Sequence, residues 1–230
     1  MWDDPTVRRG RARSCGRPIH CAVIGLLLLA ACLLLSLRAA DAALGDLDIS
    51  GYAPPLAFRM VDATTGIVVT ARDFRGKIVL LYLGYTQCPD VCPLALQNVS
   101  QALNLLGQDA AAVRLLFVTV DPTRDTLSIL KQYTAAFSQN FIGLRGDPDE
   151  IARVARRFRL AYSVTPATDG RPYQVTHSSA IYVFDGKGDA RLLIASLGTN
   201  RPDIAGTARD LSRLIHSAET HHALTSGLPR

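Results

Sequence analysis

The most constraining feature of this sequence is a run of six apolar residues, IVLLYL at 78–83, that is followed closely by a pair of cysteines. A strand with apolar side chains at every position has to be covered on both of its faces. Runs of this kind are typical of the centre of a sheet that lies between two layers of helices. The run therefore predicts an α/β domain built around residues 78–83.

Strand and helix patterns alternate on both sides of this run. The segment 58–70 holds two short strand-like runs around Thr64-Thr65-Gly66, which predicts a hairpin. Further strands are predicted at 114–120, 141–146, 180–185 and 191–198, helices at 94–107, 125–137, 147–160 and 202–216, and a polar loop at 165–175. This order predicts a thioredoxin-like mixed sheet with an N-terminal hairpin and with helices on both faces.

The charge distribution argues against a nucleic-acid partner. The isoelectric point is about 9.1, but five arginines and two aspartates in the first twenty residues give +3 of the chain's net charge of +5. The remaining +2 is spread over the other residues, which is too little for a nucleic-acid footprint. Residues 21–37 are uncharged and apolar, and 17 residues lie at the short limit for a membrane span.

This leader predicts export, because basic residues before an apolar segment stay in the cytoplasm. We favour an uncleaved anchor; the alternatives are cleavage near Ala42 and lipidation at Cys32, which ends a lipobox-like Leu29-Ala30-Ala31-Cys32. The predicted location is the bacterial inner membrane, with a single span and the main domain in the periplasm. The predicted organisation is a cytoplasmic basic leader (1–20), an anchor or signal segment (21–37), a linker (38–56), a thioredoxin-like domain (57–216) and a flexible tail (217–230).

The exported part of the chain contains only two of the five cysteines, Cys88 and Cys92. In an oxidising compartment a structural disulfide is the default interpretation. However, cysteines four residues apart close a loop so small that a disulfide constrains little of the unfolded chain. Their place between a strand and a helix N-terminus favours at least one thiolate, and two thiolates form a soft ligand pair for Cu(I) or zinc. Pro89 and Pro93 disfavour extending the helix back through the motif.

A third metal ligand is available in His177, just before the predicted strand 180–185. A lone histidine in this position is more often structural than a ligand. In a thioredoxin-like sheet, however, this strand is the neighbour of the cysteine-bearing strand. Thioredoxin-like redox enzymes have a cis-proline here, whereas this chain has His177-Ser178-Ser179. Two cysteines and a histidine suit copper in either oxidation state.

Three segments together resemble the Sco/SenC family of membrane-anchored copper proteins: GYTQCPDVCP at 84–93, VDPTRDT at 120–126 and THSSAIYVFD at 176–185. The similarity covers roughly residues 50–216. It implies a thioredoxin fold, one copper ion held by Cys88, Cys92 and His177, and a redox disulfide between the cysteines when they are oxidised. Asp90 and Asp121 are candidates for residues that do not bind the copper themselves but hold the ligand side chains in position.

The resemblance implies a metallochaperone, not an enzyme, that delivers copper to the CuA or a related centre of a respiratory cytochrome oxidase. The alternative is a thiol–disulfide reductase that reduces the cysteines of that centre before metallation. The expected partners are the copper-bearing oxidase subunit, a periplasmic thiol reductant, a second copper chaperone and the membrane. A peroxidase of the peroxiredoxin kind is disfavoured, because no matching threonine and arginine pattern precedes Cys88.

Overall fold

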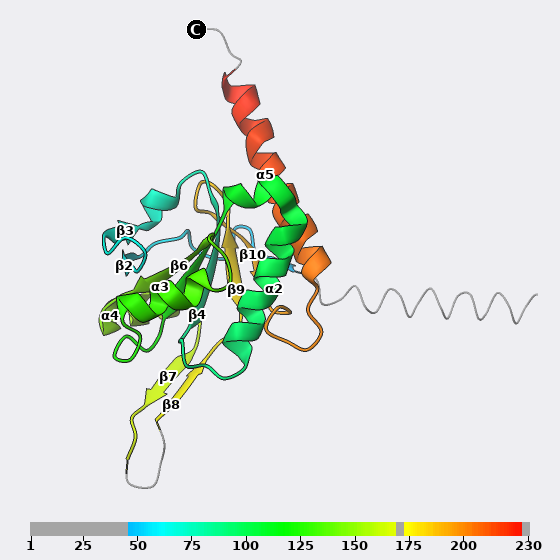
Figure 1. Ribbon diagram of the computed structural model, residues 1–230. Helices are drawn as coiled ribbons and strands as arrows, with labels where there is room; N and C mark the ends of the chain where they lie inside the picture. The colour runs from blue at the N-terminus through cyan, green and yellow to red at the C-terminus, as the bar shows by residue number, and fades with distance from the viewer. Residues whose placement is uncertain (1–45, 169–172, 227–230) are drawn as a thin grey trace, which may run out of the picture. The chain divides into compact units, whose positions relative to one another are not determined.

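The computed structural model describes residues 46–168 and 173–226, and the chain divides after Ala43 into two units, of which the second contains these residues. Figure 1 shows the elements, which are β1 (Leu47–Asp48), β2 (Arg59–Asp62), β3 (Val68–Thr70), η2 (Ala71–Phe74), β4 (Ile78–Gly84), α2 (Val91–Leu106), η3 (Gly107–Ala112), β5 (Val113–Thr119), α3 (Leu127–Ala135), β6 (Phe141–Arg145), α4 (Pro148–Arg157), β7 (Tyr162–Thr165), β8 (Gln174–His177), β9 (Ile181–Phe184), β10 (Ala190–Ile194) and α5 (Ile204–Ser226).

Eight of the strands form one mixed sheet in the order β1-β10-β9-β4-β5-β6-β2-β3. The central strands β4, β5 and β6 are parallel, and the other pairs are antiparallel. This arrangement confirms the predicted mixed sheet, the hairpin β2–β3 and the later hairpin β9–β10. It also places β9 directly beside β4, as the sequence argument about His177 requires.

Strand β4 explains why every residue of IVLLYL is apolar. Ile78, Leu80 and Tyr82 point into one core, and the alternate residues, beginning with Val79, point into the other. The first core is covered by α2, α3 and α5, and the second by α4 together with the segment 49–58. Both faces of the sheet are therefore covered by helices, which confirms the prediction.

Helix α2 begins at Val91, three residues earlier than predicted, so it includes Cys92 and Pro93. The expectation that the prolines would exclude the motif from the helix was wrong for Pro93. The first four N–H groups of a helix have no acceptor within the helix, so a proline in the first turn removes no hydrogen bond.

Other differences concern the ends of the domain and the region before β9. Part of the predicted linker packs on the domain, since β1 pairs with β10 and both Ile49 and Leu56 are buried. The last helix continues to Ser226 instead of ending near 216. The predicted polar loop 165–175 is in part a two-stranded sheet of β7 and β8.

The predicted membrane segment, 21–37, lies outside the described residues. Within 46–168 and 173–226, none of the helices has the length and apolar character needed to cross a membrane.

Candidate metal centre

The two cysteines lie at the point where β4 ends and α2 begins. Cys88 is half-buried in the connecting loop, where its N–H donates to the carbonyl of Tyr85 at 3.2 Å. Cys92 is the second residue of α2 and is fully buried. The backbone N–H of Cys92 donates to Cys88 Sγ at 3.4 Å. The N-terminus of the helix therefore contacts the sulfur of Cys88 directly.

The sulfur of Cys92 sits in a tight space against the central sheet. A Cβ atom at Gly84 would lie 2.8 Å from Cys92 Sγ and 2.7 Å from the ring of Phe117, so only glycine leaves room for the sulfur. The hydroxyl of Tyr82 faces the same sulfur at 3.8 Å. Burial raises the pKa of the Cys92 thiol above its usual value. The predicted effect of the helix N-terminus therefore does not extend to Cys92, because desolvation is the larger effect there.

His177 completes the group from the end of β8. Its Nε2 lies 3.1 Å from Cys92 Sγ, and its Nδ1 lies 2.9 Å from the carbonyl oxygen of Ser178. A carbonyl oxygen can only accept, so Nδ1 carries the proton and Nε2 presents its lone pair toward the sulfur. Burial lowers the pKa of His177, which favours the neutral imidazole that binds metals.

Two tyrosines hold the imidazole from its sides. The rings of Tyr82 and Tyr85 meet the ring of His177 edge to face, with centroids 5.9 Å and 5.8 Å away. This orientation is favourable for aromatic rings. Sequence reasoning missed both roles, because Tyr82 was counted only as part of an apolar strand and Tyr85 only as part of the cysteine motif.

The donor set fits a thiophilic metal. The sulfurs of Cys88 and Cys92 and a ring nitrogen of His177 all lie within 4.8 Å of one another. Both cysteines are free thiols, so the structural disulfide is not formed in this structure. Two sulfurs and an imidazole suit copper or zinc, whereas magnesium and calcium prefer oxygen ligands.

The two aspartates that were candidates for supporting the ligands differ. Asp90 is exposed at the N-cap position of α2, where its carboxylate makes no capping hydrogen bond. Asp121 is buried, with 1% of its surface exposed, and it accepts from Arg124 and from the hydroxyl of Tyr173. Neither carboxylate has a hydrogen bond to the cysteines or to His177 among the described residues. Of these two aspartates, only Asp121 takes part in a hydrogen-bond network, which joins it to Arg124 and Tyr173.

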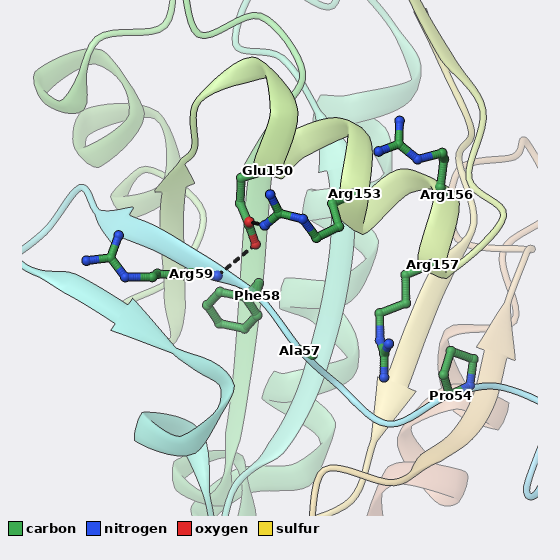
Figure 2. Close-up of a pocket in the computed structure, with 8 residues that line it drawn as sticks. All are labelled: Pro54, Ala57, Phe58, Arg59, Glu150, Arg153, Arg156 and Arg157. Carbon is green, nitrogen blue, oxygen red and sulfur yellow. Dashed lines mark hydrogen bonds and ion pairs between the residues drawn. The ribbon is translucent and has the colours of Figure 1, made fainter.

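A hollow of about 620 Å³ lies elsewhere, along α4 (Figure 2). It is lined by Pro54, Ala57, Phe58, Arg59, Glu150, Arg153, Arg156 and Arg157, so it shares no residue with the metal centre. Arg157 donates to the carbonyl of Pro55, and Arg153 pairs with Glu150, whose carboxylate also accepts from the N–H of Arg59. The contacts of Arg157 and Glu150 hold the segment before β2 and the start of β2 against α4, which gives Arg157 a structural role.

Comparison with known sequences gives one consistent match. The sequence model of the SCO1/SenC family matches residues 55–213. The mitochondrial SCO2 homolog of Bos taurus is 41% identical over 125 residues, which are 54% of this chain and 47% of that protein. The protein sco1 of Schizosaccharomyces pombe is 34% identical over 164 residues, which are 70% of this chain and 59% of that protein. The chain thus spans about half to three fifths of the length of these curated relatives.

Solved structures agree with this match. ScoI of Bradyrhizobium japonicum, with copper bound, is 38% identical, with a TM-score of 0.60 over 70% of this chain and 99% of that one. Yeast Sco1, also with copper bound, is 28% identical, with a TM-score of 0.63 over 72% of this chain and 90% of that one. The relatives thus include proteins whose structures contain the metal that the donor set here suits.

Proposed function

Since the chain belongs to the SCO1/SenC family, we propose that Cys88, Cys92 and His177 bind one copper ion as cargo, which the protein delivers to the CuA or a related centre of a respiratory cytochrome oxidase. The observation that carries the proposal is the convergence of two sulfurs and one imidazole nitrogen within 4.8 Å. The copper-bound structures of ScoI and yeast Sco1 support the choice of copper over zinc.

The three ligands differ in access, which suits transfer to an acceptor. Cys88 is half-buried on a loop, so an acceptor ligand can approach it, whereas Cys92 lies fully buried behind it. Both sulfurs bind metal as thiolates, so loading requires Cys92 to lose its proton. His177 offers Nε2 from a separate hairpin, and its hydrogen bond to Ser178 fixes the tautomer in which Nε2 carries no proton.

A thiol–disulfide reductase is the second candidate, because both cysteines are free and one is more accessible than the other. The Cys88 thiolate would attack a disulfide of the acceptor, form a mixed disulfide and release one acceptor thiolate. Cys92, after losing its proton, would then attack Cys88 and release the second acceptor thiolate. Two electrons pass to the acceptor, and the chain is left with a Cys88–Cys92 disulfide that a periplasmic thiol reductant must reduce.

The proposed partners are therefore the copper-bearing oxidase subunit, that reductant and a copper donor protein. The proposed location is the periplasmic face of a bacterial inner membrane, with attachment through the N-terminal segment. Lipidation at Cys32 and cleavage near Ala42 remain the alternatives to an anchor.

Copper titration of the reduced full-length chain in detergent tests the proposal. We expect one equivalent of copper and a sulfur-to-Cu(II) charge-transfer band. His177→Ala should weaken that band while the far-UV circular dichroism stays unchanged. His216→Ala is the matched control, because this histidine contacts Ser212 and Asp109 on another part of the domain. A His177→Ala protein that binds both copper oxidation states like the parent would rule out the proposed centre.

A disulfide reduction assay separates the two candidates. The chaperone predicts slow reduction of a generic disulfide substrate, whereas the reductase predicts rapid reduction that does not depend on His177. Rapid reduction by the His177→Ala protein would favour the second candidate.

A further inference from the structure

Arg124 joins three segments that surround the metal centre. Its Nε pairs with the carboxylate of Asp121, and its Nη1 donates to Gln87 Oε1 at 3.0 Å. Its guanidinium also lies over the ring of Tyr173, with Cζ 4.0 Å from the ring centroid. Gln87 directly precedes Cys88, and Tyr173 directly precedes strand β8, which ends in His177. One side chain therefore contacts both segments that carry the ligands.

Asp121 is the buried residue to which both Arg124 and Tyr173 bind. It follows β5 by two residues, its surface is only 1% exposed, and its backbone N–H donates to Thr119 Oγ1 at 3.0 Å. One carboxylate oxygen accepts from Arg124, and the other accepts from the hydroxyl of Tyr173 at 2.8 Å. A buried carboxylate needs such partners, so Arg124 and Tyr173 are bound to it strongly.

The hairpin β7–β8 depends on contacts of this kind for its position. Among the described residues, its two strands pair with each other and with no strand of the eight-stranded sheet. At its base, the N–H of Ser178 donates to the carbonyl of Ala161 at 2.8 Å, and Val175 packs on the core. Tyr173 attaches the opposite end of β8, four residues from His177. Fixing both ends of a paired strand restricts where its last side chain can point.

The ring of Tyr85 provides a second connection between Arg124 and the ligands. Arg124 Cζ lies 5.8 Å from the centroid of this ring, and the ring in turn meets His177 edge to face at 5.8 Å. The guanidinium, two tyrosine rings and the imidazole thus form one packed group beside the cysteines.

We propose that Arg124 and Tyr173 are positioning residues that clamp the His177 hairpin to the cysteine loop and thereby set how slowly copper leaves the centre. The proposal rests on copper binding by Cys88, Cys92 and His177. Opening the clamp frees the imidazole while both sulfurs remain in place. The clamp therefore controls the histidine and leaves the cysteines able to hold the metal.

The decisive variant is Tyr173→Ala in the full-length chain. It removes the contacts of the hairpin with Asp121 and Arg124 and leaves the Arg124–Asp121 pair intact. In the copper-free protein, hydrogen exchange of the β8 amides should be faster than in the parent. In the Cu(I)-loaded protein, transfer to a chelator should be about tenfold faster, the factor that corresponds to 1.4 kcal/mol. The Cu(II) form should show a weaker nitrogen signature in its electron paramagnetic resonance spectrum.

Two further variants remove only part of the clamp contacts. Tyr173→Phe keeps the stacking on Arg124 and loses only the hydrogen bond to Asp121, so its effect should be smaller. Arg124→Lys keeps the charge, but a lysine does not present the planar fork that contacts Asp121, Gln87 and Tyr173 together. Its effect should approach that of Tyr173→Ala. Tyr52→Ala is the control, because this tyrosine is 91% exposed.

Copper binding by the parent, together with the exchange and transfer measurements on Tyr173→Ala, distinguishes failure of the proposed function from failure of the clamp. If the parent binds no copper, the proposed function fails, and the clamp as a copper-retaining device fails with it. If the parent binds copper and Tyr173→Ala matches it in both exchange and transfer, only the clamp is wrong. Faster exchange with unchanged copper transfer also overturns the clamp, because the hairpin would then have no influence on the metal.

Discussion

The absence of a side chain at position 84 makes room for the sulfur of Cys92. Gly84 is the last residue of β4, and its backbone is in the ordinary extended region, so backbone freedom is not the reason for glycine here. The reason is space, because Cys92 Sγ and the Phe117 ring occupy the volume that a Cβ would take. The position of the Cys92 sulfur is therefore determined by the neighbouring strand β4 as well as by helix α2.

We predict that Gly84→Ala destabilises the copper-free protein by about 1–3 kcal/mol, the usual cost of overpacking a core. It should also weaken copper binding, because the Cys92 sulfur has to leave its present position beside His177. Urea unfolding and copper titration measure the two effects. Gly186→Ala is the control, since its nearest contact, Gly76 Cα at 3.3 Å, is less severe. An unchanged unfolding midpoint for Gly84→Ala would show that the sulfur and the ring can move at little cost.

The proximity of Cys88, Cys92 and His177 could be predicted from the sequence, although His177 lies 85 positions after Cys92. This proximity was predicted because a thioredoxin-like sheet places the strand after His177 beside the cysteine-bearing strand, and β9 does pair with β4. The surrounding side chains could not be found in this way. The contact between Arg124 and Tyr173 depends on the directions of their side chains, and Tyr173 lies in the segment 165–175 that was predicted to be a polar loop. No periodicity connects such residues before the fold is known.

At the scale of elements, the loop before α3 is joined to the cysteine loop by a buried carboxylate. Thr126 is the N-cap of α3, and its side chain accepts from the N–H of Ile129. Asp125 points inward instead. It accepts from the N–H and the hydroxyl of Thr86 at 3.0 Å and 2.6 Å and from the hydroxyl of Thr119 at 2.6 Å. This carboxylate therefore holds the start of the Cys88 loop against the end of β5.

Asp125→Ala should lower the free energy of unfolding by about 2 kcal/mol or more, because three donors lose a charged acceptor in a buried site. Copper binding should weaken as well, since Thr86 is two residues from Cys88. Chemical denaturation of the copper-free protein measures the first effect. Asp90→Ala is the control, and its exposed carboxylate, which makes no capping bond, should contribute less than about 0.5 kcal/mol. Equal losses in the two variants would contradict a special role for Asp125.

The elements that were predicted correctly have strong apolar patterns, such as β4 and β5. Those that were missed do not. Strands β7 and β8 are four residues each and mostly exposed, so their sequences lack a buried face that could indicate a strand. The early start of α2 was missed for another reason, since a proline was taken as a barrier where the first turn of a helix accepts it.

At the scale of the whole domain, the segment before β2 is part of the fold. Strand β1 extends the sheet at its edge beside β10, and Asp46, directly before β1, accepts from the hydroxyl of Thr207 on α5 at 3.3 Å. Burial, with smaller contributions from the neighbouring carboxylates of Asp210 and Asp203, raises the pKa of Asp46 to about 6. One of its oxygens is buried with no hydrogen-bond partner among the described residues.

This carboxyl makes the stability of the domain depend on pH. Its pKa is higher in the folded than in the unfolded state, so its favourable contribution is complete below pH 4 and is lost as the pH rises through about 6. Asp46→Asn should therefore match the parent near pH 4 and be more stable at pH 7.5, by roughly 1 kcal/mol after allowance for partial solvent screening. Thermal unfolding of the copper-free protein across this range measures the difference. Asp48→Asn is the control, because hydrogen bonds from Ser50 lower the pKa of Asp48, and its removal should bring no gain at pH 7.5. A gain for Asp46→Asn that is equally large at pH 4 would show that ionisation is not its cause.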